Sequence, residues 1–193
     1  MRAEYLLIIS PSTSVRDVVL YLKKQLGNKI NDYPGRYSQP HISILWVELD
    51  DSLEHQLFSS LFKILALESP IVLTTNGIKY FPSSKTIYLG IEETSSFEQM
   101  SRNIGKSSFI VGLPAEFRSS TYVPHLTINR NLEHSFDFAR DYFGEYSYKE
   151  SFTASSALLL KRYDGGRYFP VQEFPFCAVL SGQLPMFTPP IYV

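Results

Sequence analysis

The chain has 193 residues, 44% hydrophobic and 15% aromatic, which suits one domain with a buried core and excludes a disordered chain. Its 18 basic and 19 acidic residues give a net charge of -1, which argues against a protein that coats long nucleic acid. A single cysteine excludes an internal disulfide bond and any zinc site built on cysteines.

The N-terminal segment is typical of a buried strand. Its apolar run at residues 5–9 is too short for a signal peptide, and Glu4 stands where such a peptide carries positive charge. No stretch approaches 18 apolar residues, so we expect no membrane-spanning helix and no membrane partner. The lone Cys177 has apolar neighbours, as a small buried side chain does. These features predict a soluble, cytoplasmic protein, and we expect a monomer.

The first half of the chain alternates strands and helices. After the strand at residues 5–9, apolar residues between 15 and 26 follow the spacing of one helix face. Two prolines and a glycine predict a loop at residues 31–40, and bulky, β-branched residues predict a strand at 41–49. Leucines spaced from 53 to 65 then predict a second helix.

The second half has a similar order and ends in an irregular tail. We expect a turn at residues 164–166 to lead into a returning strand, and a proline-rich tail over 177–193. Mixed strands and helices without a linker indicate one α+β domain over residues 1–193. The other expected elements are strands at 71–75, 85–91, 125–129 and 152–163, and helices that begin at residue 95 and span 136–143.

One five-residue motif occurs twice. The sequence PHISI at residues 40–44 returns 84 residues later as PHLTI at 124–128. A strand that contains a tyrosine, Tyr5 or Tyr88, precedes each copy by a similar interval, and a predicted helix lies between. We interpret this pattern as a duplicated strand–helix–strand unit, whose two copies would pack as two lobes about a pseudo-two-fold axis.

The spacing within each motif places an imidazole beside a hydroxyl. Side chains alternate between the two faces of a strand, so His41 and Ser43 share a face, as do His125 and Thr127. Each pair is about 7 Å apart along the strand. If the two strands face each other, two imidazoles and two hydroxyls converge on one site.

This set of groups suits in-line displacement at phosphorus. An imidazole exchanges protons near neutral pH, and a hydroxyl donates a hydrogen bond to an anionic oxygen. We expect His125 to activate water and His41 to protonate the leaving oxygen, although the near symmetry of the motifs also permits the reverse. Ser43 and Thr127 would bind the phosphate oxygens.

Four further residues outside the motifs are an arginine, the tryptophan and the other two histidines. Arg130 lies three residues beyond the second hydroxyl, so alternation puts it on the opposite face unless the strand ends first; it is a candidate phosphate ligand or a solvated charge. Trp46 lies five residues beyond the first histidine, and we expect it in the core on the opposite face. His55 and His134, near predicted helix starts, are expected on the surface.

At the paired motifs the sequence resembles the 2H phosphoesterase superfamily, and within it the LigT-like, 2′-5′ RNA ligase branch. HLTINR at residues 125–130 resembles the second motif of that branch, and residues 154–162 with FPF at 174–176 resemble its C-terminal strand pair. The resemblance covers roughly residues 4–176. It implies two antiparallel sheets that form a central groove, with the helices outside.

The resemblance also implies a metal-independent cyclic phosphodiesterase that needs no cofactor. Its substrate would be a cyclic nucleotide or an RNA end with a 2′,3′-cyclic phosphate. The catalytic residues would be His41 and His125, and Ser43, Thr127 and Arg130 would bind the substrate phosphate. Two alternatives remain open from the sequence: an RNA 2′,5′-ligase, and a non-catalytic module that binds nucleotides or RNA ends.

Overall fold

The computed structural model describes residues 1–30, 35–92, 94–144 and 146–178, so the expected tail lies outside the described residues beyond Ala178. In chain order its elements are β1 (Arg2–Ile9), α1 (Thr13–Ile30), β2 (Ile42–Asp50), η1 (Asp51–Leu53), α2 (Glu54–Leu65), β3 (Ile71–Phe81), β4 (Thr86–Glu92), α3 (Ser95–Gly105), α4 (Ser108–Gly112), η2 (Ala115–Phe117), β5 (Arg118–Ser120), β6 (His125–Asn129), η3 (Glu133–Ser135), α5 (Phe136–Phe143), β7 (Ser151–Ala154), β8 (Ser156–Arg162) and β9 (Phe169–Pro175). Within these described ranges, no helix has the length and apolar character needed to span a bilayer.

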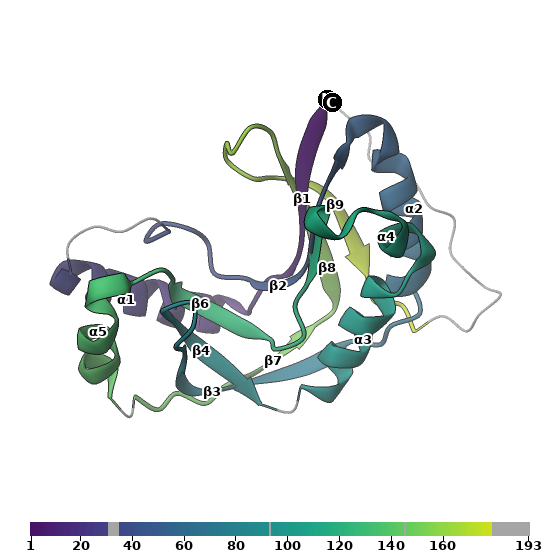
Figure 1. Ribbon diagram of the computed structural model, residues 1–193. Coiled ribbons are helices and arrows are strands. Elements are labelled where there is room, and N and C mark those ends of the chain that lie inside the picture. The colour runs from purple at the N-terminus through teal and green to yellow at the C-terminus, as the bar shows by residue number, and fades with distance from the viewer. Residues whose placement is uncertain (31–34, 93, 145, 179–193) are drawn as a thin grey trace.

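The strands form two antiparallel sheets. The five-stranded sheet has the order β5-β2-β1-β8-β9, and the four-stranded sheet has the order β6-β4-β3-β7. The sheets meet at an angle, with α1 and α5 beyond the four-stranded sheet and α2, α3 and α4 beyond the other (Figure 1). The predicted α+β architecture of two antiparallel sheets with outer helices is therefore confirmed.

The first helix of each half packs against the sheet of the other half. Helix α1 follows β1 of the five-stranded sheet but contacts β6 of the four-stranded sheet. Helix α3 follows β4 of the four-stranded sheet but contacts β2 and β5. This reciprocal exchange ties the two halves of the duplication together, and β2 and β6, the strands of the two motifs, also contact each other.

Alternating burial distinguishes the two faces of the five-stranded sheet. Tyr5 and Leu7 of β1 are fully buried, and the Tyr5 hydroxyl donates to Glu54 of α2, so this outer face lies under the helices. Residues of the opposite, inner face are mostly only partly buried; they include Leu6, Ser43, Trp46, Leu158 and Leu160. The inner face is therefore the more exposed of the two, while the outer face carries the core.

The strand predicted over residues 152–163 is in fact two strands in different sheets. Strand β7 pairs with β3, whereas β8 pairs with β1 and β9, and only Ser155 separates them. The sequence prediction of one strand was wrong because neither proline nor glycine marks the crossing. Helix α4 and strand β5 were not predicted. Cys177 is exposed rather than buried, because β9 ends two residues before it.

The two tyrosines that precede the motifs are not equivalent. Tyr5 pairs with Val47, whereas Tyr88 pairs with Thr127 of the second motif. The residue of β1 that corresponds to Tyr88 is Ile8, which pairs with Ser43. The similar intervals in the sequence therefore do not reflect the register of the strands, although the duplication of the motifs themselves holds.

A buried ion pair joins β8 to the start of α2. The Lys161 ammonium contacts the carboxylates of Asp51, at 2.9 Å, and Glu54, while the Tyr163 hydroxyl donates to Asp51. Replacing Lys161 by methionine leaves both carboxylates without their cation, so we expect the free energy of unfolding to fall by about 1.5–3 kcal/mol. Urea denaturation measures the loss, with exposed Lys63→Met on α2 as control; equal stability of the two variants would contradict this account.

Candidate active site

Both motifs have the alternation that the sequence predicts. Ile42, Leu126 and the isoleucine that ends each motif are almost completely buried in the core. The imidazoles and hydroxyls of His41, Ser43, His125 and Thr127 are partly exposed on the opposite side. The apolar residues anchor each strand to the core, and this anchoring turns the histidine and the hydroxyl of each copy toward the inner face.

A β-bulge follows each motif hydroxyl. In β2, Ser43 and Leu45 pair with consecutive residues of β1, so Ile44 is an extra residue. In β6, the same shift leaves Ile128 as the extra residue after Thr127. A bulge moves the alternation of the strand by one residue, so side chains beyond it change face.

The first bulge brings Trp46 onto the inner face with Ser43. Its indole N–H donates to the Glu4 carboxylate at 3.0 Å, and Arg162 donates to the same oxygen at 2.6 Å. The hydrogen bond from Arg162, together with that from Trp46, holds the pKa of Glu4 below its usual range. The prediction that Trp46 lies on the face opposite the first motif was therefore wrong, because the sequence does not mark the bulge.

The second bulge and the end of β6 bring Arg130 to the same side as the motif. The strand ends at Asn129, so Arg130 does not follow the alternation that would have turned it away. Its side chain is exposed, and its positive charge contributes to lowering the pKa of both His41 and Lys23. The guanidinium therefore lies near the first motif, within reach of a ligand held there.

The two imidazoles are oriented in the same way. The Nδ1 atom of His41 lies 2.9 Å from the carbonyl oxygen of Gln39, and Nδ1 of His125 lies 2.8 Å from that of Val123. A carbonyl oxygen only accepts, so each Nδ1 carries the hydrogen and each neutral ring has its lone pair on Nε2. Each motif therefore presents the nitrogen that can accept or return a proton.

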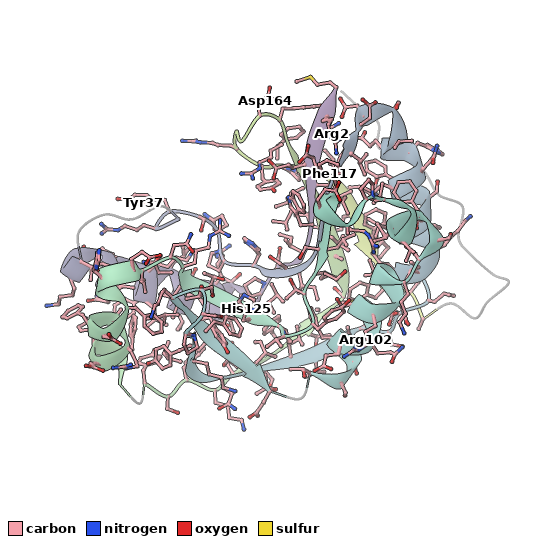
Figure 2. The ribbon with its side chains drawn as sticks, in the orientation of Figure 1. Arg2, Tyr37, Arg102, Phe117, His125 and Asp164 are labelled. Atoms are coloured by element: carbon pink, nitrogen blue, oxygen red, sulfur yellow. The ribbon has the colours of Figure 1, made fainter. Side chains whose placement is uncertain are left out.

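Aromatic rings surround His125. The rings of Phe81 and Tyr88 stack on each other at 4.2 Å and meet the imidazole edge-on, at centroid distances of 5.1 and 5.2 Å. Burial among these rings lowers the pKa of His125, and the hydrogen bond to Val123 partly opposes this effect. Figure 2 shows His125 near the middle of the molecule, where the two sheets approach each other.

Positive charges surround His41. Burial lowers the pKa of its imidazole, the hydrogen bond to Gln39 partly opposes that, and the charges of Lys23, Arg130 and His125 lower it further. Because β2 and β6 contact each other, the two motifs lie side by side. The site thus has an aromatic side and a cationic side, although its two motifs are nearly identical in sequence.

Lys79 is a further inner-face residue that the sequence did not indicate. It pairs with Tyr88, whose other partner is Thr127, and so lies in the same row across the sheet. Its alkyl chain passes over Gly90, which pairs with His125. A Cβ atom added to Gly90 would lie only 2.7 Å from Lys79 Cδ, so the glycine leaves room for the lysine chain. Only the register of β3 on β4 brings this cation there, so no motif could have shown it.

The remaining histidines lie outside the site. His55 and His134 are exposed, as the sequence predicts. In the described part of the chain, no group of three or more histidine, cysteine, aspartate or glutamate side chains is arranged to hold a metal ion.

Comparison with known families gives one decisive match. The family model of the 2′-5′ RNA ligase superfamily matches residues 14–166, a range that includes both motifs. The chain belongs to this superfamily. The resemblance to LigT-like 2H phosphoesterases is therefore confirmed, and membership supports phosphoesterase chemistry in general. Comparison with curated proteins found no match.

Several solved structures share the fold. LigT of E. coli in complex with phosphate has a TM-score of 0.64 at 14% sequence identity, over 91% of this chain and 98% of LigT. TT0787 of Thermus thermophilus has a TM-score of 0.61 at 14% identity, over 92% and 98%. Usb1 of Kluyveromyces marxianus has a TM-score of 0.55 at 12% identity, over 90% and 97%. Identities this low show a common fold.

In this member of the 2′-5′ RNA ligase superfamily, a cavity of about 180 Å³ lies along β8 and β9, which β1 separates from the strand of the first motif. Leu158 of the inner face and Ser10 line it; Ser10 follows Ile9, which pairs with Ile42 of the motif. Glu173 and residues 153–156 complete the lining, and Ser156 donates to Glu173 at 2.6 Å. The cavity is lined by hydroxyl groups and one carboxylate, and no histidine or hydroxyl of the two motifs lines it.

Proposed function

We propose that the protein is a cyclic phosphodiesterase that opens 2′,3′-cyclic phosphates on RNA ends or small nucleotides without a metal ion. The observation that carries the proposal is the convergence of two identically oriented imidazoles, His41 and His125, from facing strands. Each has a hydroxyl two residues along its strand, Ser43 or Thr127. Two proton-transfer groups with phosphate-binding donors between them match the needs of in-line displacement at phosphorus.

The proposed reaction moves one proton at each histidine. Nε2 of neutral His125 accepts a proton from water while the water oxygen forms a bond to phosphorus. The bond between phosphorus and one ribose oxygen breaks, and protonated His41 gives its proton to that oxygen. The product is a phosphate monoester; His125 then releases its proton to solvent, and His41 takes one up from solvent, which restores the starting state.

The surroundings of the two rings favour this assignment. Burial lowers the pKa of both rings, and the cations near His41 lower the pKa of His41 further, which makes its imidazolium a stronger acid; the anionic phosphate, once bound, favours protonation of the same ring. His125 has aromatic neighbours, and burial keeps its ring neutral, as a base requires. Ser43, Thr127 and Arg130 would hold the non-bridging oxygens.

A small nucleotide or the end of an RNA chain fits the molecule as substrate. The net charge of -1 argues against a protein that coats a long polyanion. LigT of E. coli, which shares the fold, has been crystallised with phosphate and with 3′-AMP, which supports a nucleotide-type ligand here.

The proposal is tested by incubating the protein with 2′,3′-cyclic nucleotides and with RNA that ends in a 2′,3′-cyclic phosphate, with a chelator present. We expect phosphate monoesters as products. Tight binding without turnover would instead favour a non-catalytic binder. Joining of the RNA end to a 5′-hydroxyl RNA, with no monoester formed, would favour 2′,5′ ligation as the main activity.

The pH dependence of turnover is a further prediction. The active state needs one neutral and one protonated imidazole, and both pKa values are lowered from 6.5 in the free protein. We therefore expect kcat/KM to follow a bell whose maximum lies below pH 6.5. Bound phosphate favours both imidazolium forms, so the maximum of kcat should lie at higher pH. A kcat/KM maximum on the alkaline side of neutrality would contradict this prediction.

A further inference from the structure

A buried lysine supports the loop before the first histidine. Lys23 of α1 is 3% exposed, and its ammonium donates to the carbonyl oxygen of Ser38 at 2.8 Å and to its hydroxyl at 2.8 Å. A third hydrogen bond, of 3.3 Å, goes to the carbonyl oxygen of Gly35. Because a buried ammonium is stable only when its donors are satisfied, these contacts fix the loop to the helix.

The loop that Lys23 fixes also orients His41. The Ser38 hydroxyl donates to Gly35 at 2.7 Å and closes the turn, and the next carbonyl along the chain, that of Gln39, accepts the hydrogen of His41 Nδ1. The ammonium is therefore one residue away from the group that fixes the imidazole. A shift of this loop would move the Gln39 carbonyl and leave Nε2 less well directed.

Lys23 also contributes charge to this side of the site. Burial, with a contribution from Arg130, lowers the pKa of Lys23 to about 8, so the ammonium is still largely charged at neutral pH. The charged and titratable groups that act on His41 are Lys23 from α1, His125 from β6 and Arg130 at the end of that strand. Lys23 thus acts on His41 through both hydrogen bonds and charge.

The second half of the molecule has a neutral counterpart. Ser101 of α3 is fully buried and donates to the Thr121 carbonyl at 2.7 Å, on the segment that leads to His125. In each half, therefore, a helix side chain holds the chain just before the histidine. Only the first half uses a cation, and this difference is one source of the asymmetry between the two imidazoles.

We propose that Lys23 is a positioning residue for His41, which it orients through the turn at residues 35–38 and the carbonyl of Gln39. Its effect on turnover rests on the proposed function, whereas its effect on the imidazole does not. The role is specific to the first motif, so loss of Lys23 should change His41 and leave His125 as it is. No motif in the sequence assigns such a role to a residue of α1.

The test compares Lys23→Gln and Lys23→Met with Lys24→Met, which changes the neighbouring exposed lysine of the same helix. Nitrogen NMR of the imidazoles reports the tautomer and the pKa of each ring without substrate. In the wild type and in Lys24→Met we expect both neutral rings to carry the hydrogen on Nδ1. In the Lys23 variants, His41 should become a mixture of tautomers with a raised pKa, because a positive charge is lost, while His125 stays unchanged.

Turnover provides the second measurement. Misplacement of a catalytic ring is expected to lower kcat/KM by about 10- to 100-fold in the Lys23 variants and not in Lys24→Met. An unchanged His41 tautomer and pKa in folded Lys23→Gln would overturn the proposal. If the wild type fails to turn over, the proposed function is wrong, but the NMR result still decides the role of Lys23. Lys23→Gln is the informative variant if Lys23→Met fails to fold, since glutamine keeps one donor for the loop.

Discussion

Replacing His41 or His125 by alanine is expected to lower kcat/KM for opening a 2′,3′-cyclic nucleotide by about 10²- to 10⁴-fold. In the proposed mechanism each ring supplies one proton transfer, and neither can replace the other because their Nε2 atoms belong to different strands. Each variant should also lose one limb of the bell-shaped pH profile. Initial rates over a range of pH measure both effects.

The control for this experiment is His134→Ala, which removes an exposed imidazole outside the site. It should turn over like the wild type. The rings of His41 and His125 are partly exposed, and their Nδ1 atoms bond to carbonyls two residues away, so their loss should leave the fold intact. Wild-type turnover by either His41→Ala or His125→Ala would show that the two imidazoles are not the catalytic groups.

Removing a motif hydroxyl is expected to have the second largest effect. Ser43→Ala or Thr127→Val should lower kcat by about 10²- to 10³-fold, equivalent to about 2.7–4 kcal/mol, because a donor to the charge that develops on the phosphate oxygens is lost. Valine keeps the shape of threonine on β6, so the loss is chemical rather than steric. Steady-state kinetics with a cyclic nucleotide measures it.

Exchange of the two hydroxyl residues gives the matched control. Ser43→Thr and Thr127→Ser keep a donor at each position and should retain most of the activity. If Thr127→Val turns over as fast as Thr127→Ser, the hydroxyl does not stabilise the transition state. A loss of similar size in all four variants would point to packing of the strands instead.

The sequence predicted the strands of the site because their burial is periodic. Ile42 and Leu126 alternate with the histidines, and a period of two has one structural meaning, a strand with one buried face. The repetition of the motif then placed His41 and His125 in corresponding positions. The expectation that the two motif strands meet, β2 in one sheet and β6 in the other, needed only this symmetry, and the contact between them agrees with it.

What lies beyond each motif could not be predicted, because the bulges have no sequence signal. Ile44 and Ile128 are ordinary strand residues, and only the pairing with β1 and β4 shows that they are extra. Alternation without a bulge would put Trp46 and Arg130 on the wrong face. The placement of both residues on the inner side is therefore known only from the structure. The role of Arg130 in phosphate binding stays a prediction.

The difference between the surroundings of the two histidines could not be predicted from the sequence either. The aromatic rings near His125 come from β3 and β4, and the cations near His41 come from α1 and the end of β6. These neighbours depend on tertiary packing, in which α1 crosses to the opposite sheet. A repeated motif predicts two similar groups, and only the fold shows how their surroundings differ.

The most direct test of the two-histidine mechanism is the initial rate of ring opening by the wild type and by the double variant His41→Ala/His125→Ala, with a chelator present. Because the two rings act in one step, removal of both should cost little more than removal of either. We predict turnover by the wild type and, in the double variant, a rate near that of the least active single variant. Turnover by the double variant at the wild-type rate would contradict the mechanism.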